Sequence, residues 1–261
     1  MGSCNSGGKG GVGIGSTGMP TQAQATPQVD DTQIASAFSA TYDKFMAMSD
    51  DEKADFIEAN INQGVPAHLA QNDFQRFVYH SGLNEKPDVV DDDTLDKMTG
   101  TEMFRTVNNV YDKKNDLSYS ADQIAKQVMS GRVTRVSDNG GSVYGRGIYF
   151  ADNYYDSVGV YGNGRNDVKI TAVMRAKLNN NAKVINYNKA RAGADKEISS
   201  GSKLGKILNK CDNKSQVSIY AMSKGYNVIH NGANYLNVLN RNAMTMSSSI
   251  KDVKDWLGSW K

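Results

Sequence analysis

The stretch that most constrains this chain is residues 145–152, which reads Gly-Arg-Gly-Ile-Tyr-Phe-Ala-Asp. Gly145 and Gly147 come directly before a short apolar run, and glycines in such places let another group approach the backbone closely. Tyr149, inside the run, offers a flat ring on which a second ring can stack. The pattern predicts a turn, a strand and the start of a helix, either at a ligand site or in the core.

Composition and hydrophobic periodicity divide the chain into three parts. Residues 1–30 are rich in Gly, Ser, Thr, Gln and Pro and have almost no large apolar side chains, so we expect a flexible tail. Its role as a linker, a packaging arm or an anchor stays open. Short amphipathic helices are expected in residues 31–100, as a helical lead-in to a main domain in residues 101–261.

Local patterns predict the elements within these parts. Ser49, with Glu52 in the capping-box position, and Ser120 are placed as helix N-caps. Helices are predicted at residues 31–48, 50–62, 67–79, 121–129, 204–211 and 217–224, and helix with loop at 189–201. A last helix, with Ser247 or Ser248 as its cap, is expected to carry Ile250, Val253, Trp256 and Leu257. Strands are predicted at residues 102–108, 148–151, 167–178, 182–187, 226–229 and 236–246.

Charge and cysteine usage narrow the classes of function. The chain has 30 basic and 28 acidic residues, and no basic run marks a nucleic-acid groove or a membrane patch. Cys4 and Cys211 lie far apart, without a disulfide framework, and neither cysteines nor histidines show metal-ligand spacing. No apolar run approaches the roughly 18 residues of a membrane span. We therefore expect a cytoplasmic, reducing compartment and no metal.

The order of several motifs resembles a known superfamily. A strand carrying Arg105 is followed by a helix at residues 121–129, then by the motif at 145–152, and late in the chain by residues 225–242. Over residues 100–246 this succession resembles the ADP-ribosyltransferase superfamily. The motif at 145–152 is most similar to its diphtheria-toxin and poly(ADP-ribose) polymerase branch. The layout, with its lead-in and glycine-rich tail, also resembles members encoded by bacteriophages.

The resemblance implies a fold, a co-substrate and a reaction. The fold is α+β, with two packed and mainly antiparallel sheets and NAD in the cleft between them. Nicotinamide leaves through an oxocarbenium-like transition state, and ADP-ribose passes to a protein or nucleic-acid acceptor. The similarity to bacteriophage members implies a toxin-like enzyme, associated with a virion and delivered into a bacterial host.

The resemblance also assigns site residues. Arg105, followed by Thr106, is the donor to ribose or phosphate on the first strand, with His80 as the alternative. Tyr149 stacks on the nicotinamide, and Tyr161 supplies the second aromatic ring. The remaining cofactor contacts are expected from Gly145, Gly147, Phe150, Ala151 and Ser157.

This sequence departs from the family at the catalytic glutamate. Asn237 stands at that position, and an uncharged amide should lower the rate by something on the order of 10²–10³. Three functions stay open: a weak transferase, a non-catalytic virion or structural protein on the same fold, and an NAD glycohydrolase. A carboxylate could come from the substrate or from Glu197. If the alignment is right, Asn237→Glu should raise NAD turnover.

Overall fold

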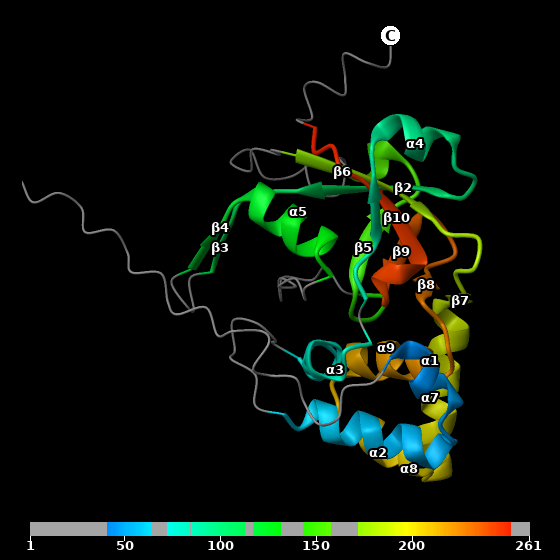
Figure 1. Cartoon of the computed structure of the whole chain (residues 1–261). Helices are drawn as coiled ribbons and strands as arrows, with labels where there is room; N and C mark the ends of the chain where they lie inside the picture. Colours follow the sequence, from blue (N-terminus) through cyan, green and yellow to red (C-terminus); the bar gives the residue numbers. More distant parts are fainter. Residues whose placement is uncertain are drawn as a thin grey trace, which may run out of the picture. The chain divides into compact units, whose positions relative to one another are not determined.

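A computed structural model describes residues 41–63, 72–83, 85–112, 117–131, 143–157 and 172–251. All of them belong to one compact unit, Ala35–Lys261. This unit is α+β, with a mostly antiparallel sheet (Figure 1). The expected tail at 1–30, the end of the chain from residue 252 onward and Tyr161 lie outside the described residues.

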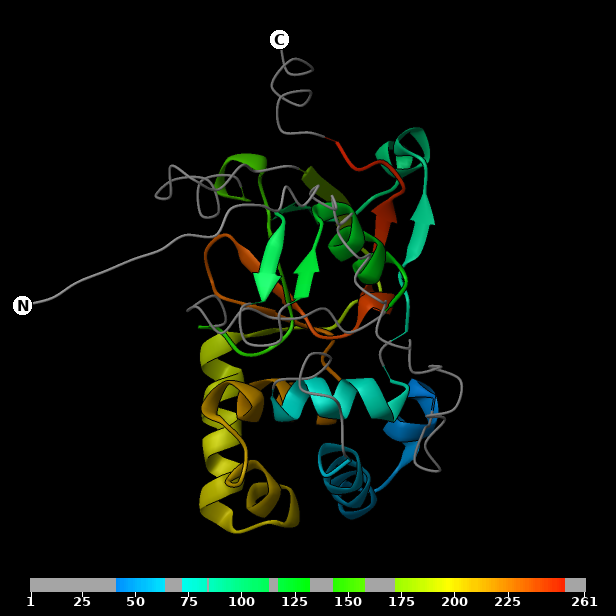
Figure 2. The ribbon, with the colours of Figure 1, turned by 90° about the vertical axis from the view of Figure 1, so that its left-hand side faces the viewer.

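Six helices from two distant parts of the chain share one hydrophobic core. They are α1 (Tyr42–Ala47), α2 (Asp50–Ile61), α3 (Asp73–Ser81), α7 (Tyr187–Ser200), α8 (Lys203–Leu208) and α9 (Asn213–Ser223). The rings of Phe45, Phe56 and Phe77 lie 5.4–6.4 Å apart within this core. Figure 2 shows α2 and α3 beside the yellow helices of the second half. The lead-in helices therefore bury their apolar faces against the later part of the chain.

The two helix starts expected from capping residues are both confirmed. Ser49 caps α2, with its hydroxyl accepting from the Glu52 N–H at 3.3 Å while the Glu52 carboxylate accepts from the Ser49 N–H at 2.8 Å. Ser120 and Gln123 form the same reciprocal pair at the start of α5 (Ala121–Met129). These bonds satisfy backbone donors that a helix leaves free in its first turn.

His80 lies in helix α3 and not on a strand, so the structure does not place it as an alternative first-strand donor. Asn72 starts this helix by accepting from the Gln75 N–H at 2.8 Å. The apolar face that begins with Phe74 and Phe77 turns His80 inward, where it is 3% exposed. Neither of its ring nitrogens has a hydrogen-bond partner. Burial therefore lowers the pKa of His80.

His80 should make the folded protein sensitive to acid. The unfolded chain takes up a proton near pH 6.5, whereas the folded chain resists protonation until a lower pH. Stability contributed by neutral His80 is thus complete above about pH 6.5 and is lost as the pH falls, by up to about 1.4 kcal/mol per pH unit. Urea unfolding at pH 7 and pH 5 should show a smaller acid loss for His80→Phe. Equal losses in both proteins would contradict this.

Eight strands form one sheet in the order β1-β10-β6-β2-β5-β9-β8-β7. They are β1 (Asp88–Val90), β2 (Glu102–Val107), β5 (Ile148–Ala151), β6 (Ala172–Leu178), β7 (Val184–Asn186), β8 (Val228–His230), β9 (Tyr235–Val238) and β10 (Met244–Ser247). The pairings β1–β10 and β7–β8 at the two edges are parallel, and the inner pairings are antiparallel. Two further short strands, β3 (Val110–Asp112) and β4 (Leu117–Tyr119), pair with each other.

The expected two packed sheets differ from this single sheet. However, its strands fall into two groups, β1-β10-β6-β2 and β5-β9-β8-β7, and β2 meets β5 through one register pair, Phe104 with Ala151. By contrast, β2 and β6 pair along six positions. In Figure 1, β2 and β6 run across the view, whereas β5 runs down it. The sheet is therefore weakly joined at the boundary between β2 and β5.

One predicted strand was wrong as a single element. The strand expected at 236–246 is split into β9 and β10 by the 3-10 turn η1 (Arg241–Ala243), because Asn240 accepts from the Asn242 N–H at 3.3 Å and turns the chain. β9 then pairs with β5 and β8, while β10 pairs with β6 and β1. Within the expected lead-in, β1 belongs to the sheet and is followed by α4 (Asp92–Lys97).

The two faces of the sheet pack against different hydrophobic cores. We call the α5 face the one on which Ala121, Ala125 and Val128 of α5 pack in a single core with residues such as Met103 and Phe150. The side chains that alternate with these point to the opposite face. On the opposite face, Ile229 and Leu239 join the core of the six helices. These two faces decide which of the expected site residues can meet.

Candidate functional site

Thr106 and Ser157 are brought together on the opposite face. The Thr106 N–H donates to Ser157 Oγ at 2.9 Å, and the two hydroxyl oxygens lie 3.0 Å apart. Both residues are buried, with exposures of 3% and 1%. The Ser157 hydroxyl thereby links the helical turn after β5 to β2, across the weak boundary of the sheet.

Arg105 lies on the α5 face, away from Thr106. It pairs in register with Met174, whose side chain belongs to the core beneath α5. Its guanidinium Nη1 donates to the backbone carbonyl of Tyr149 at 2.8 Å. A charged side chain thus connects β2 to β5 next to Phe104 and Ala151, the single register pair between the two strand groups.

Tyr149 and Asn237 lie directly opposite each other in the β5–β9 register. Their neighbours Phe150 and Val238 belong to the core on the α5 face, so both side chains point to the opposite face. The Tyr149 hydroxyl accepts from the Tyr144 N–H at 2.9 Å and donates to the Gly145 carbonyl at 2.8 Å. Tyr149 is 9% exposed. Its hydroxyl therefore holds residues 143–147, which we call the glycine loop.

Asn237 also holds the glycine loop, through hydrogen bonds from its side-chain amide. Its Nδ2 donates to the carbonyls of Tyr144 at 3.2 Å and Arg146 at 3.3 Å, and its Oδ1 has no hydrogen-bond partner. The side chain is 1% exposed. A glutamate here would bring carboxylate oxygens, which only accept, to two carbonyl acceptors. The geometry therefore gives this asparagine a structural task that an acid cannot perform.

The two glycines let the loop lie close to the protein itself. A Cβ on Gly147 would stand 2.1 Å from Asn237 Oδ1 and 2.8 Å from the Val238 carbonyl oxygen. At Gly145, where φ is +97°, a Cβ would stand 2.8 Å from Ser218 Oγ. The close approach that the sequence predicts is therefore occupied by protein atoms in this conformation.

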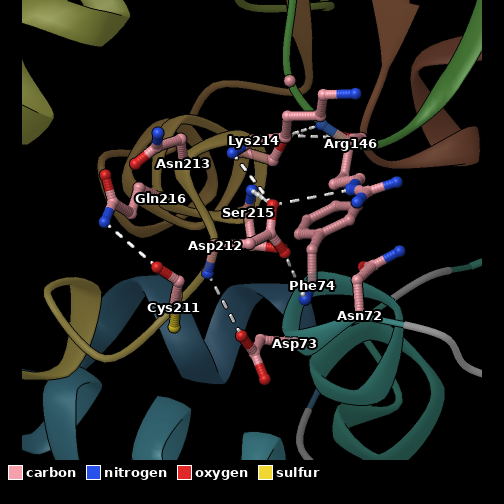
Figure 3. A network of polar contacts seen from close by, with 12 residues as sticks. Asn72, Asp73, Phe74, Arg146, Cys211, Asp212, Asn213, Lys214, Ser215 and Gln216 are labelled. Carbon is pink, nitrogen blue, oxygen red and sulfur yellow. Dashed lines mark hydrogen bonds and ion pairs between the residues drawn. The ribbon is translucent and has the colours of Figure 1, made fainter. Parts of the chain in front are cut away.

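The glycine loop is anchored to helix α9. Ser218 Oγ accepts from the Arg146 N–H at 2.6 Å and donates to the Arg146 carbonyl at 2.5 Å. The Arg146 guanidinium Nε lies 3.7 Å from Asp212 Oδ1 (Figure 3). Asp212 also caps α9 and is joined to α3 through its backbone N–H, 3.4 Å from Asp73 Oδ2. One network thus fixes the loop, the start of α9 and the start of α3.

The other expected residues are less directly involved. Phe150 lies in the core on the α5 face and is 1% exposed, so its ring does not accompany that of Tyr149. Ala151 is buried opposite Tyr235. Glu197 lies in α7, where its carboxylate accepts from Ser202 Oγ at 2.6 Å and pairs with Lys224 at 3.1 Å. These contacts, the bond from Ser202 first, lower the pKa of Glu197 and hold it in the helical part.

Sequence reasoning missed two residues of this region. Ser218 lies within α9, and no local signal connects it with a glycine loop 72 positions away. Arg241 was absorbed into an expected strand, although it is 3% exposed in the structure. An arginine between two asparagines inside an apolar strand pattern was the available signal for it.

In the part of the chain described here, no group of three or more His, Cys, Asp or Glu residues is arranged to hold a metal ion. Within the same ranges, no helix is long and apolar enough to cross a membrane. Comparison with known proteins finds no matching family model, no similar curated protein and no similar solved structure.

Proposed function

We propose that this protein binds NAD and transfers ADP-ribose to a protein or nucleic-acid acceptor. The observation that carries the proposal is that three motif positions far apart in sequence lie on neighbouring strands. Arg105 is on β2, Tyr149 on β5 and Asn237 on β9, and these strands are consecutive in the sheet. Arg105 touches the Tyr149 backbone, and Tyr149 pairs with Asn237.

The weak boundary between β2 and β5 supports an ADP-ribosyltransferase fold with its co-substrate at this place. In this proposal, the two strand groups, which are joined by one register pair, take the place of the two sheets of that fold. In the proposed arrangement, the Tyr149 ring stacks on the nicotinamide and Ser157 lies near its amide. The Arg105 guanidinium lies on the α5 face but reaches the Tyr149 carbonyl at the boundary between β2 and β5, and there it binds ribose or phosphate oxygens. NAD supplies the nicotinamide that leaves, and these side chains orient the bound NAD.

Two specific contacts favour a second candidate, a non-catalytic relative on the same fold that serves as a virion or structural component. Both amide hydrogens of Asn237 are used to hold carbonyls of the glycine loop. A side chain so engaged offers no charge to an oxocarbenium-like transition state. An NAD glycohydrolase, with water as the acceptor, shares the proposed binding site and differs only in the product.

Incubation of the full chain with NAD labelled on the adenine, with and without a bacterial lysate, tests these alternatives. For a transferase, label enters a macromolecular acceptor, and the rate falls by roughly ten- to hundredfold in Arg105→Met, which loses a charged hydrogen-bond donor. Tyr155→Ala is the control, because Tyr155 lies two residues before Ser157 in the sequence and is 74% exposed. Thermal melting verifies that each variant folds.

The other outcomes are equally informative. Release of nicotinamide without labelled acceptor identifies a glycohydrolase. NAD binding by calorimetry without turnover identifies the non-catalytic relative. Absence of NAD binding by the folded wild-type chain would overturn the proposal.

A further inference from the structure

Arg241 is an almost fully buried guanidinium at the turn between β9 and β10. It is 3% exposed, and its Nη1 donates to the Gly131 carbonyl at 2.9 Å, at the end of α5. Its Nε has no hydrogen-bond partner, and neither has Nδ2 of Asn240, the residue before it. Asn240 is itself 0% exposed. Two buried donors in one turn therefore lack an acceptor, although buried donors are nearly always paired.

The charge of Arg241 is also uncompensated. Among the described residues, no carboxylate forms an ion pair with it. Burial, and then the nearby positive charge of Arg105, lower the pKa of Arg241 to about 9. Because a guanidinium keeps its proton at neutral pH, Arg241 stays charged there. Two positive side chains thus lie close enough to repel each other.

Arg175 on β6 shows how the same sheet treats an arginine that has a structural role. Its guanidinium pairs with the carboxylates of Asp96 and Glu102. Burial acts to lower the pKa of Arg175, but these two carboxylates together raise it above the ordinary value. Arg241 is more deeply buried and has one neutral carbonyl in place of two acids. A helix C-terminus interacts favourably with a cation, yet one carbonyl uses one of five guanidinium donors.

From the burial and the unpaired donors of this turn we infer that Arg241 binds a phosphate-type anion, and that the pyrophosphate group of a dinucleotide is its source. Arginine suits phosphate because its planar fork donates two parallel hydrogen bonds to phosphate oxygens. The identification of the source rests on the proposed function, whereas the anion site rests on the buried, unpaired donors of Arg241 and Asn240. The positive charge of Arg105, which acts on Arg241, lies where Arg105 contacts the Tyr149 carbonyl at the boundary between β2 and β5.

Calorimetry and thermal melting of the full chain with inorganic pyrophosphate test the anion site. At about 100 times the dissociation constant, pyrophosphate should raise the melting temperature of the wild type by roughly 5–10 °C. Arg241→Met should weaken pyrophosphate binding at least about tenfold. Without the anion, this variant should melt no lower than the wild type, because a buried unpaired charge has been removed.

Arg175→Met is the matched control, an arginine on the same sheet with two acidic partners. It should lower the melting temperature and leave the affinity for pyrophosphate within about twofold of the wild type. Arg241→Lys should bind pyrophosphate with an affinity between those of wild type and Arg241→Met, because lysine keeps the charge without the fork.

Several outcomes would overturn the inference. No binding of pyrophosphate or phosphate by the wild type would do so, as would an Arg241→Met variant that melts lower and binds pyrophosphate normally. If inorganic phosphate binds and pyrophosphate does not, the dinucleotide is excluded as the source. Pyrophosphate binding through Arg241 without NAD binding would leave the anion site standing and remove the proposed function. NAD binding that is unchanged in Arg241→Met would leave the proposed function standing and exclude the dinucleotide as the source of the anion.

Discussion

Replacing Asn237 by aspartate is expected to destabilise the fold by about 3–5 kcal/mol at neutral pH, the cost of an uncompensated buried charge. The Asn237 amide donates to the carbonyls of Tyr144 and Arg146 and is 1% exposed. Aspartate has nearly the same shape but no donor when ionised. Its oxygens would face two carbonyl oxygens, and the glycine loop would lose its two hydrogen bonds from residue 237.

The loss should depend on pH with a definite sign. A carboxylate buried against carbonyl oxygens has a pKa above that of the unfolded chain, near 3.9. The folded variant then binds more protons than the unfolded chain in the interval between the two values, so its stability falls as the pH rises. Urea unfolding at pH 5 and pH 8 should show the larger deficit at pH 8.

Asn181→Asp provides the control, because Asn181 is an exposed asparagine between β6 and β7. Its free energy of unfolding should change by about 0.5 kcal/mol or less. The outcome also bears on the expectation that an acid at position 237 restores turnover. If Asn237→Asp were as stable as the wild type and turned NAD over faster, the position would accept a catalytic carboxylate. The contacts of the amide instead predict a damaged loop and no gain.

Sequence predicted those elements whose signals are local. Ser49 and Ser120 were correct as N-caps because a capping box is complete within four residues. The single strand at 236–246 was wrong because apolar residues lie on both sides of Asn240, Arg241 and Asn242, and this polar run was taken as part of one strand. The two halves pair with different strands, β9 with β5 and β8, and β10 with β6 and β1, and these partners are far away in sequence.

In the candidate site, too, local features could be predicted from the sequence and long-range contacts could not. Alternation along a strand already implies that Arg105 and Thr106 point to opposite faces, and the structure separates them in this way. The pairing of Tyr149 with Asn237 depends on the register of β5 and β9, which local sequence does not determine. Ser218 contacts the loop only because α9 packs beneath it. The residues that hold the site are thus the ones that sequence reasoning missed.

Gly147→Ala is expected to lower the free energy of unfolding by about 3 kcal/mol or more. This is the upper end of the range for overpacking, because the added atom meets atoms that are fixed in place. The added Cβ would stand 2.1 Å from Asn237 Oδ1 and 2.8 Å from the Val238 carbonyl oxygen. The Asn237 side chain is held by its own two bonds, and the Val238 oxygen belongs to a paired strand. Neither can move aside, so the glycine loop must lift and lose its bonds to Asn237 and Tyr149.

Gly201→Ala separates this clash from ordinary glycine effects. Gly201 ends α7 with φ of +66°, and a Cβ there would meet nothing within 4 Å. Its substitution should therefore cost about 1 kcal/mol, the strain of a left-handed residue. Urea unfolding compares the two variants, and amide hydrogen exchange follows the Tyr144 N–H, which donates to the Tyr149 hydroxyl at 2.9 Å. Protection of this N–H should be lost in Gly147→Ala and kept in Gly201→Ala.

The same variant distinguishes two explanations for the glycine at position 147. If Gly147 serves to let NAD approach the backbone, alanine should lower NAD affinity while stability and Tyr144 protection stay near the wild-type values. If Gly147 serves to let the loop lie on Asn237, as the 2.1 Å approach indicates, stability and protection fall together, whether or not NAD is present. A Gly147→Ala protein as stable as Gly201→Ala would contradict the loop packing described here. It would then favour a loop that already stands away from Asn237 and leaves the Tyr149 ring open to a ligand.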